Sequence, residues 1–167
     1  MPQYEDLLQR YLVPLRRLVW SYVRDTAESD DLLQEIALAL WTALPRFRGD
    51  SSERTWVYRV AHNTAISYVT SHKRRTAREQ ALEPANEPAT GIDSEAQAID
   101  RAQLRWLWNA IRELPLTDRQ VVVLYLEEMT AAEIEAVTGL SAASIATRLT
   151  RVRQRLAIRQ RGEEVRG

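Results

Sequence analysis

The sequence predicts an all-α protein with two small helical domains joined by a flexible linker, the C-terminal one containing a helix-turn-helix. Apolar residues recur at i, i+3 and i+4 along most of the 167 residues, and the alternation typical of strands is nearly absent. Glycine and proline are few, at 5 and 6. Residues 76–100 contain Pro84, Pro88 and Gly91 and few large apolar side chains, which indicates a linker between the domains.

Two helices are expected in the first half of the N-terminal domain. The first is expected from Gln3 to Arg24 with an apolar stripe from Tyr4 to Val23, and Pro14 inside it should kink or split the helix. The second helix is expected to begin with Ser29 as its N-cap and to stop at Pro45. Its predicted buried stripe consists of Leu32, Leu33, Ile36, Leu40, Trp41 and Leu44.

A third helix is expected to follow a loop at residues 46–51 and to run to about His72. Asp50 and Glu53 fit an N-cap with an acid three residues later. The spacing places Trp56 among the inward-facing residues. The opposite face is expected to carry Arg54, Tyr58, Arg59, His62, Asn63 and Ser67.

Four helices are expected in the C-terminal domain. The first starts near Ile99 and ends at Pro115, and the second opens with a capping box of Thr117 and Gln120. A second capping box, a left-handed glycine and a serine N-cap then mark a short helix, a tight turn and a longer helix; these residues are Thr130 with Glu133, Gly139 and Ser141. This is the form of a helix-turn-helix, whose second helix enters the major groove of DNA.

Composition excludes several classes of protein. There is no cysteine, so disulfides and thiolate metal sites are ruled out. His62 and His72 are ten residues apart on one predicted helix, too far for a shared metal site, and no glycine-rich phosphate loop occurs. We therefore expect no enzyme activity, no catalytic residue, no metal and no cofactor. No apolar run approaches the roughly 20 residues of a membrane span, and the N-terminus lacks a signal core, so a cytoplasmic protein without membrane insertion is expected.

The charges are balanced in number but not in position. The chain has 23 basic and 23 acidic residues, which argues mildly against nucleic-acid binding. Residues 76–100 hold six acids and one base, however, whereas residues 141–161 hold six arginines and no acid. The basic stretch is either a solvated helix face or a DNA-binding helix. Taken alone, the helix-turn-helix pattern favours neither interpretation over the other.

Several motifs in order along the chain resemble one family. They are Ser29–Glu35, Trp41, Pro45–Gly49, Arg54–Asn63, Leu114–Pro115, Arg119–Leu124 and Arg148–Leu156. Together they resemble the extracytoplasmic-function (ECF) sigma factors of the sigma-70 superfamily, which are non-catalytic subunits that direct RNA polymerase to promoters. The resemblance implies a sigma region 2 domain at residues 1–75, an acidic linker at 76–100, a sigma region 4 domain at 101–161 and a tail at 162–167.

The resemblance also implies a role for each surface. Binding of core polymerase is expected at Asp31, Gln34 and Glu35. Binding of the promoter −10 element, with one strand held open, is expected at Phe47, Arg48, Asp50, Arg54, Tyr58, Arg59, His62, Asn63, Lys73, Arg74 and Arg75. Binding of the −35 element is expected at Ser141, Ala143, Ser144, Thr147, Arg148, Arg151 and Arg155. An anti-sigma factor is the further partner that the resemblance implies, beside core polymerase and promoter DNA.

The sequence departs from the family pattern at several positions. Ala39, Ala146 and His62 stand where basic residues are frequent in the family, Ala37 where an aromatic residue is common, and Ser67 where an acid is common. Fewer cations mean fewer neutralised phosphates, so we expect the protein without polymerase to bind DNA weakly. Two other functions remain open: a stand-alone helix-turn-helix regulator, and a sigma-like protein that acts mainly through an anti-sigma partner.

Overall fold

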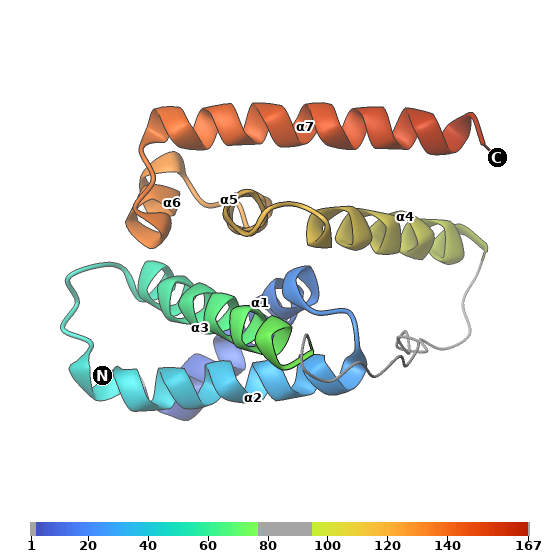
Figure 1. Ribbon diagram of the computed structural model, residues 1–167. Helices are drawn as coiled ribbons and strands as arrows, with labels where there is room; N and C mark the ends of the chain where they lie inside the picture. Colours follow the sequence, from blue (N-terminus) through green and yellow to red (C-terminus); the bar gives the residue numbers. More distant parts are fainter. Residues whose placement is uncertain (1–2, 77–94, 167) are drawn as a thin grey trace.

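The computed structural model describes the backbone of residues 3–76 and 95–166 and the side chains of residues 3–71 and 100–166. The helices in these ranges are α1 (Tyr4–Tyr22), α2 (Thr26–Ala43), the short 3-10 helix η1 (Leu44–Arg46), α3 (Glu53–Thr76), α4 (Glu95–Arg112), α5 (Leu116–Leu126), α6 (Ala131–Thr138) and α7 (Ala142–Glu164). No strand occurs in the described ranges, which confirms the all-α prediction. Figure 1 shows two layers, with α1–α3 below and α4–α7 above.

The N-terminal layer is held together by apolar side chains at helical spacing. Its fully buried residues include Leu7, Leu15 and Leu18 from α1, Leu32, Ile36 and Leu40 from α2, and Val57, Ala61 and Ala65 from α3. Helix α1 continues through Pro14 without a break, so the expected alternative of a split does not occur. A proline costs the helix one backbone hydrogen bond. Burial of leucines on both sides of Pro14, at about 1.5–3 kcal/mol for each fully buried side chain, outweighs that loss.

Three predicted helix starts in this chain were wrong. The side chain that caps α2 is Asp25, which accepts from the Glu28 amide at 3.1 Å, so Ser29 lies inside the helix. The side chain at the start of α3 that accepts from a backbone amide is Ser52, bonded to the amide of Thr55 at 3.1 Å. In both of these cases another good capping residue stands only a few positions from the predicted one.

The start of α5 is the third error. The helix follows Pro115 without any side-chain cap, and Gln120 is buried instead of capping. Pro115 itself occupies the N-cap position with φ −52° and ψ 147°, so α5 begins at Leu116, before the expected cap Thr117, and the capping box of Thr117 and Gln120 does not form.

The helix-turn-helix, by contrast, has the predicted local chemistry. The Thr130 amide donates to Glu133 Oε2 at 2.7 Å and the Glu133 amide donates to Thr130 Oγ1 at 3.2 Å, which confirms the capping box. Gly139 has the left-handed φ of +74° that ends α6. Ser141 caps α7 by accepting from the Ser144 amide at 3.2 Å.

The segment between the layers is shorter than the predicted linker. Helix α3 continues to Thr76 and α4 already begins at Glu95, so residues 95–100 are helical. The rest of the predicted linker, residues 77–94, lies outside the described residues.

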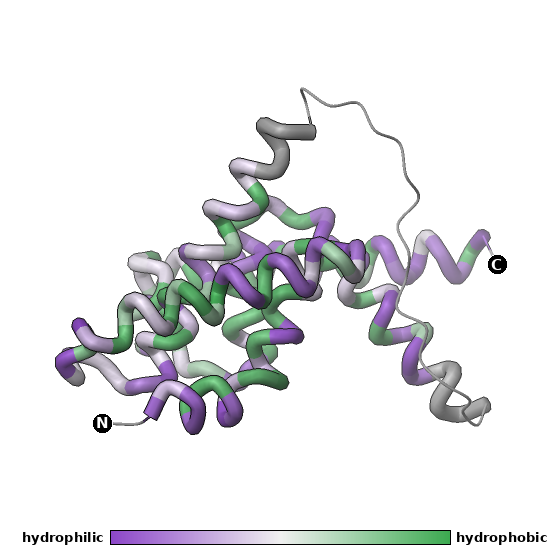
Figure 2. Tube along the Cα trace, turned by 90° about the horizontal axis from the view of Figure 1, so that it is seen from below, coloured by the Kyte–Doolittle hydropathy of each residue, from purple (hydrophilic) through white to green (hydrophobic). Residues whose placement is uncertain are grey.

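The two layers pack against each other. Helix α3 contacts α6, and α1 contacts α4 and α5. In Figure 2 hydrophobic residues gather where the helices meet, whereas the C-terminal end of α7 is largely hydrophilic. None of the described helices is both long and apolar enough to cross a membrane.

Candidate functional site

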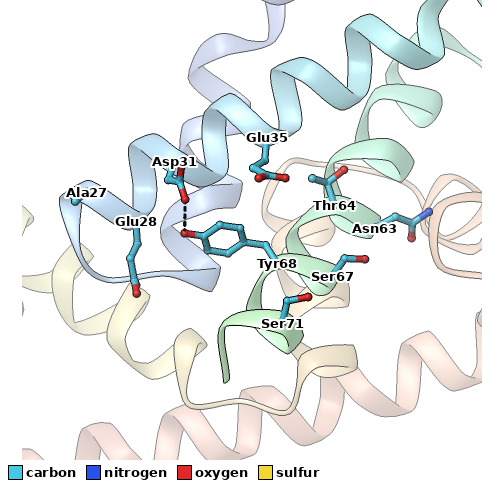
Figure 3. Close-up of a pocket in the computed structure, with 9 residues that line it drawn as sticks. All are labelled: Ala27, Glu28, Asp31, Glu35, Asn63, Thr64, Ser67, Tyr68 and Ser71. Carbon is cyan, nitrogen blue, oxygen red and sulfur yellow. Dashed lines mark hydrogen bonds between the residues drawn. The ribbon is translucent and has the colours of Figure 1, made fainter. Parts of the chain in front are cut away.

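A groove between α2 and α3 carries two of the residues predicted to bind polymerase. It has a volume of about 790 Å³ and is lined by Ala27, Glu28, Asp31, Glu35, Asn63, Thr64, Ser67, Tyr68 and Ser71. Figure 3 shows the Tyr68 side chain reaching from α3 to Asp31 on α2, to which its hydroxyl donates at 3.0 Å. Burial and this hydrogen bond raise the pKa of Tyr68 to about 12.

Charge along this groove has one sign. Asp31 and Glu35 stand one helical turn apart on α2, and no arginine or lysine is among the lining residues. Gln34 is exposed on the same helix but does not line the groove. Asn63, predicted for the −10 element, also lines it. The groove therefore presents carboxylates to a partner that carries cations.

The residues predicted to bind the −10 element do not form one exposed surface in the structure. Arg48 and Asp50 are exposed in the loop before α3, while Phe47 packs on Trp56 with ring centroids 4.9 Å apart. Trp56 was expected in the core, but it is only partly buried and packs against the core from its edge. The side chains of Lys73, Arg74 and Arg75 lie outside the described residues.

His62 is fully buried, so its predicted outward position is wrong. Its Nδ1 lies 2.8 Å from the Tyr22 hydroxyl, between α1 and α3. Burial lowers the pKa of His62 to about 3 and keeps the ring uncharged. The simple face assignment failed because α1 and the C-terminal layer cover part of α3 that would be exposed on an isolated helix. A neutral, enclosed imidazole has no access to a phosphate.

Three further residues of the predicted −10 set contact the C-terminal layer. The hydroxyl of Tyr58, a residue that is 2% exposed, donates to Glu127 Oε2 at 3.0 Å. Burial and the nearby Glu127 carboxylate raise the Tyr58 pKa well above its ordinary value. The Arg54 guanidinium donates to the Glu127 carbonyl oxygen, and Arg59 donates to the Ala136 carbonyl oxygen through Nε at 3.1 Å and Nη2 at 2.8 Å.

Arg17 and Glu127 also belong to this contact, although no pattern in the sequence singles them out. Arg17 donates to the Glu127 carboxylate through Nε at 2.6 Å and Nη2 at 2.8 Å. The hydrogen bond to Glu127 raises the pKa of Arg17. Periodicity indicates which face of its own helix each residue occupies, but not a partner 110 positions away in the chain.

The outer face of α7 displays most residues predicted to bind the −35 element. Ser141, Ala143, Thr147, Arg151 and Arg155 are exposed. A shallow hollow of about 460 Å³ on this face is lined by Ala146, Thr147, Thr150, Arg151 and Gln154. Thr150 and Gln154 were not among the predicted site residues; both follow from the helical spacing of Thr147 and Arg151.

Two predicted members of the −35 set have structural roles at the base of α7. The Ser144 amide is bonded to the Ser141 cap, and the Ser144 side chain is half-buried. Arg148 Nη1 forms an ion pair with Asp118 Oδ1 of α5 at 2.6 Å. Nowhere in the described part of the chain do three or more histidine, aspartate or glutamate side chains gather so that they could hold a metal ion.

Each of the two layers matches a known protein family model. Residues 7–75 match the family model described as Sigma-70 region 2, and residues 104–156 match the model described as Sigma-70, region 4. The chain is 30% identical over 156 residues to the ECF RNA polymerase sigma-E factor of Escherichia coli, covering 89% of this chain and 81% of that protein. It belongs to the ECF group of the sigma-70 family. The chain is therefore an alternative sigma factor that directs transcription.

Other similar proteins support the same family assignment. The chain is 30% identical over 155 residues to the RNA polymerase sigma-H factor of Pseudomonas aeruginosa, covering 86% of this chain and 73% of that protein. Two solved structures share its fold. The sigma factor RpoE in complex with the anti-sigma factor NepR from Bartonella quintana has a TM-score of 0.69 at 19% identity, over 91% of this chain and 94% of that one. CnrH in complex with the cytosolic domain of CnrY has a TM-score of 0.68 at 22% identity, over 95% and 88%.

Proposed function

We propose that this sigma factor binds both promoter elements itself and docks on core polymerase through the acidic groove between α2 and α3. The observation that carries the proposal is the exposed face of α7 in a helix-turn-helix. Threonines, a glutamine and an arginine there surround a shallow hollow, and such side chains recognise base edges in the major groove. The −35 surface then consists of Ser141, Ala143, Thr147, Arg151 and Arg155, with Thr150 and Gln154 added. Arg148 and Ser144 hold the helix that carries it.

The −10 surface is proposed at the loop before α3 and on the adjoining face of that helix. Arg48 and Asp50 are exposed in this loop, and Arg54 and Arg59 supply cations beside it. Single-stranded DNA is held by cationic contacts to its backbone and by stacking on aromatic rings. Phe47 lies against Trp56 at this loop, which makes an aromatic pair available to a flipped base. Lys73, Arg74 and Arg75, at the far end of α3, would add backbone contacts.

The polymerase surface is proposed at Asp31, Gln34 and Glu35. The groove beside them carries carboxylates and no cation among its lining residues, so a partner with arginines would complement it. The groove lies between α2 and α3, and Figure 1 shows α2 and α7 on opposite sides of the molecule, so core polymerase and the −35 element would not compete for one face.

The remaining assignments follow from the same family. We propose that residues 1–75 and 101–161 act as the two functional domains, joined by residues 76–100 and followed by a tail at 162–167. An anti-sigma factor is the proposed regulatory partner, since solved relatives include a complex with the anti-sigma factor NepR. The protein is proposed to be non-catalytic and to act in the cytoplasm, where polymerase meets the chromosome.

In vitro transcription tests the proposal. Purified core polymerase is mixed with the full chain and a library of promoter fragments with randomised upstream sequences, and the transcribed fragments are sequenced. We expect two enriched elements at a constant spacing, near −10 and −35. The matched control is the same chain carrying Arg151→Ala, which should lose enrichment in the upstream element alone. Transcripts without any enriched element, or transcription independent of the added chain, would contradict the proposal.

A further inference from the structure

The turn between α5 and α6 places one acidic side chain against the N-terminal domain. The Glu127 carboxylate receives hydrogen bonds from Arg17 at 2.6 and 2.8 Å and from the Tyr58 hydroxyl at 3.0 Å, and Arg54 donates to the carbonyl oxygen of the same residue. Only 9% of the Glu127 side chain is exposed. A guanidinium fork and a phenol hold the carboxylate and make a formed anion site, because charge-assisted bonds of this kind are strong and directional. The second guanidinium, of Arg54, lies beside this site on the neutral carbonyl oxygen of the same residue.

The chemistry of this site also suits a phosphodiester. A guanidinium fork matches the oxygens of a phosphate as well as those of a carboxylate. Arg54 and Tyr58 belong to the α3 face proposed for the −10 strand. Arg59 extends the same face and also donates to the C-terminal layer, at the Ala136 carbonyl. The contact between the layers thus occupies the cations proposed to hold DNA.

We propose that Arg17, Arg54 and Tyr58 form a phosphate-binding site for the unwound promoter strand, which Glu127 fills as an internal substitute while the two layers are packed together. This inference rests on the proposed −10 function of α3. It adds Arg17, on α1, to the DNA-binding residues. Because Glu127 and a DNA phosphate need the same three side chains, the packed chain is closed to the −10 strand and must open before it binds.

Two further contacts at the edge of the boundary are polar and exposed. Arg112 Nη1 donates to the Trp20 carbonyl oxygen at 2.7 Å, and Arg24 donates to Asn109 at 3.0 Å. Interactions of arginine at the rim of an interface weaken with salt, and polar contacts between domains permit relative motion. A polyanion that offers several phosphates can therefore replace them.

The first test removes the internal competitor. Glu127→Gln is compared with Glu128→Gln, the neighbouring exposed acid of the same turn, so that both variants change the net charge equally. Affinity for a short fluorescein-labelled oligothymidylate is measured by fluorescence anisotropy on the full chain. We expect Glu127→Gln to bind about 3- to 10-fold more tightly than wild type, since apparent affinity rises with the open fraction. Glu128→Gln should stay within about twofold of wild type, as a solvated charge contributes little.

The second test removes the site itself. Arg17→Ala should loosen the packing as Glu127→Gln does, which small-angle scattering reports as a larger radius of gyration. Its effect on the oligonucleotide should have the opposite sign, a loss of affinity. The slope of log affinity against log salt should become shallower by about 0.7, the value for one phosphate contact to a single strand. Arg16→Ala, at the neighbouring exposed arginine, is the control, and Arg17→Lys should restore the slope because it keeps the charge.

The outcomes separate this inference from its alternatives. If Arg17 and Glu127 only stabilised the packing, both variants would shift oligonucleotide affinity in the same direction, and this result would overturn the proposal. Equal affinities for Glu127→Gln and Glu128→Gln would overturn it as well, as would an unchanged salt slope in Arg17→Ala. The probe contains no promoter sequence and no polymerase. If Glu127→Gln and Arg17→Ala change oligonucleotide affinity in opposite directions but the chain directs no promoter-specific transcription, only the proposed promoter function is refuted. If the chain directs such transcription but the two variants change affinity in the same direction, only the phosphate site is refuted.

Discussion

Arg148 Nη1 lies 2.6 Å from Asp118 Oδ1, and this ion pair ties the recognition helix α7 to α5. The Asp118 side chain is 1% exposed and that of Arg148 is 26% exposed. An arginine that neutralises a buried carboxylate is held in place by it and does not extend to a base edge. Arg148 therefore positions α7, whereas Arg151, one turn along, is exposed and available to DNA.

Replacing Arg148 should lower the unfolding free energy of the C-terminal domain. Arg148→Ala leaves the Asp118 carboxylate buried without a counter-charge, and breaking a buried pair in this way costs about 3 kcal/mol of unfolding free energy. Urea denaturation followed by circular dichroism measures it. Arg151→Ala is the matched control and should change stability by less than about 0.5 kcal/mol, as expected of an exposed side chain. Equal stability of the two variants would show that the ion pair does not hold the helix.

Arg151 should instead affect promoter affinity. Arg151→Ala removes a side chain that reaches base edges or phosphates from α7, and we expect −35 binding to weaken by about 1–3 kcal/mol. Duplex binding by the polymerase complex, at constant salt, measures this on a promoter recovered from the library. Arg153→Ala provides the comparison, because Arg153 Nη2 donates to the phenol oxygen of Tyr125 at 2.8 Å and its guanidinium covers that ring. Unchanged affinity in Arg151→Ala would remove this residue from the −35 surface.

The parts of the fold that were predicted correctly depend on neighbouring residues. The Thr130–Glu133 capping box, the left-handed Gly139 and the Ser141 cap each involve groups at most three or four positions apart. Local chemistry of this kind is encoded in a short segment, so the helix-turn-helix could be placed without knowing what packs against it.

Unlike the three wrong helix starts, which are local, the wrongly placed side chains depend on distant segments. Trp41 lies on the apolar side of its pattern but is 59% exposed, where it meets the Tyr4 ring edge-on at 4.9 Å. His62 was placed outside but is enclosed by Tyr22 of α1. The bond between Arg17 and Glu127 joins residues 110 positions apart, so no local pattern could reveal it. Such contacts depend on how helices pack, which periodicity alone does not specify.

Charge reversal at the acidic groove should reduce binding to core polymerase. Asp31→Lys with Glu35→Lys replaces two carboxylates by ammonium groups at the surface proposed for a cationic partner, and like charges across an interface cost several kcal/mol. We expect at least about tenfold weaker binding, measured by fluorescence titration with core enzyme. Glu135→Lys with Glu164→Lys is the control, since both acids are exposed in the C-terminal layer. Wild-type binding by the first double variant, with an unchanged circular dichroism spectrum, would rule out this surface.

Acid should destabilise the N-terminal domain through His62. Burial lowers the pKa of His62 in the folded chain to about 3, whereas an unfolded histidine titrates near about 6.5. Between these values the unfolded state binds a proton that the folded state does not, so stability falls as the pH drops from about 6.5 toward 3. The loss is about 1.4 kcal/mol for each pH unit, and no contribution is expected above about pH 7.

A substitution isolates the contribution of His62 from those of the carboxylates. The two tyrosine rings beside His62 belong to Tyr22 and Tyr58, whose pKa values are raised by burial, so neither titrates in acid. His62→Gln removes the titrating ring, and urea unfolding of both proteins at a series of pH values gives the difference in slope. Wild type should lose stability faster than the variant below about pH 6.5, and Asn63→Gln should keep the wild-type slope because it changes no titrating group. Parallel curves for wild type and His62→Gln would mean that His62 is protonated in the folded chain, and the buried neutral imidazole would have to be abandoned.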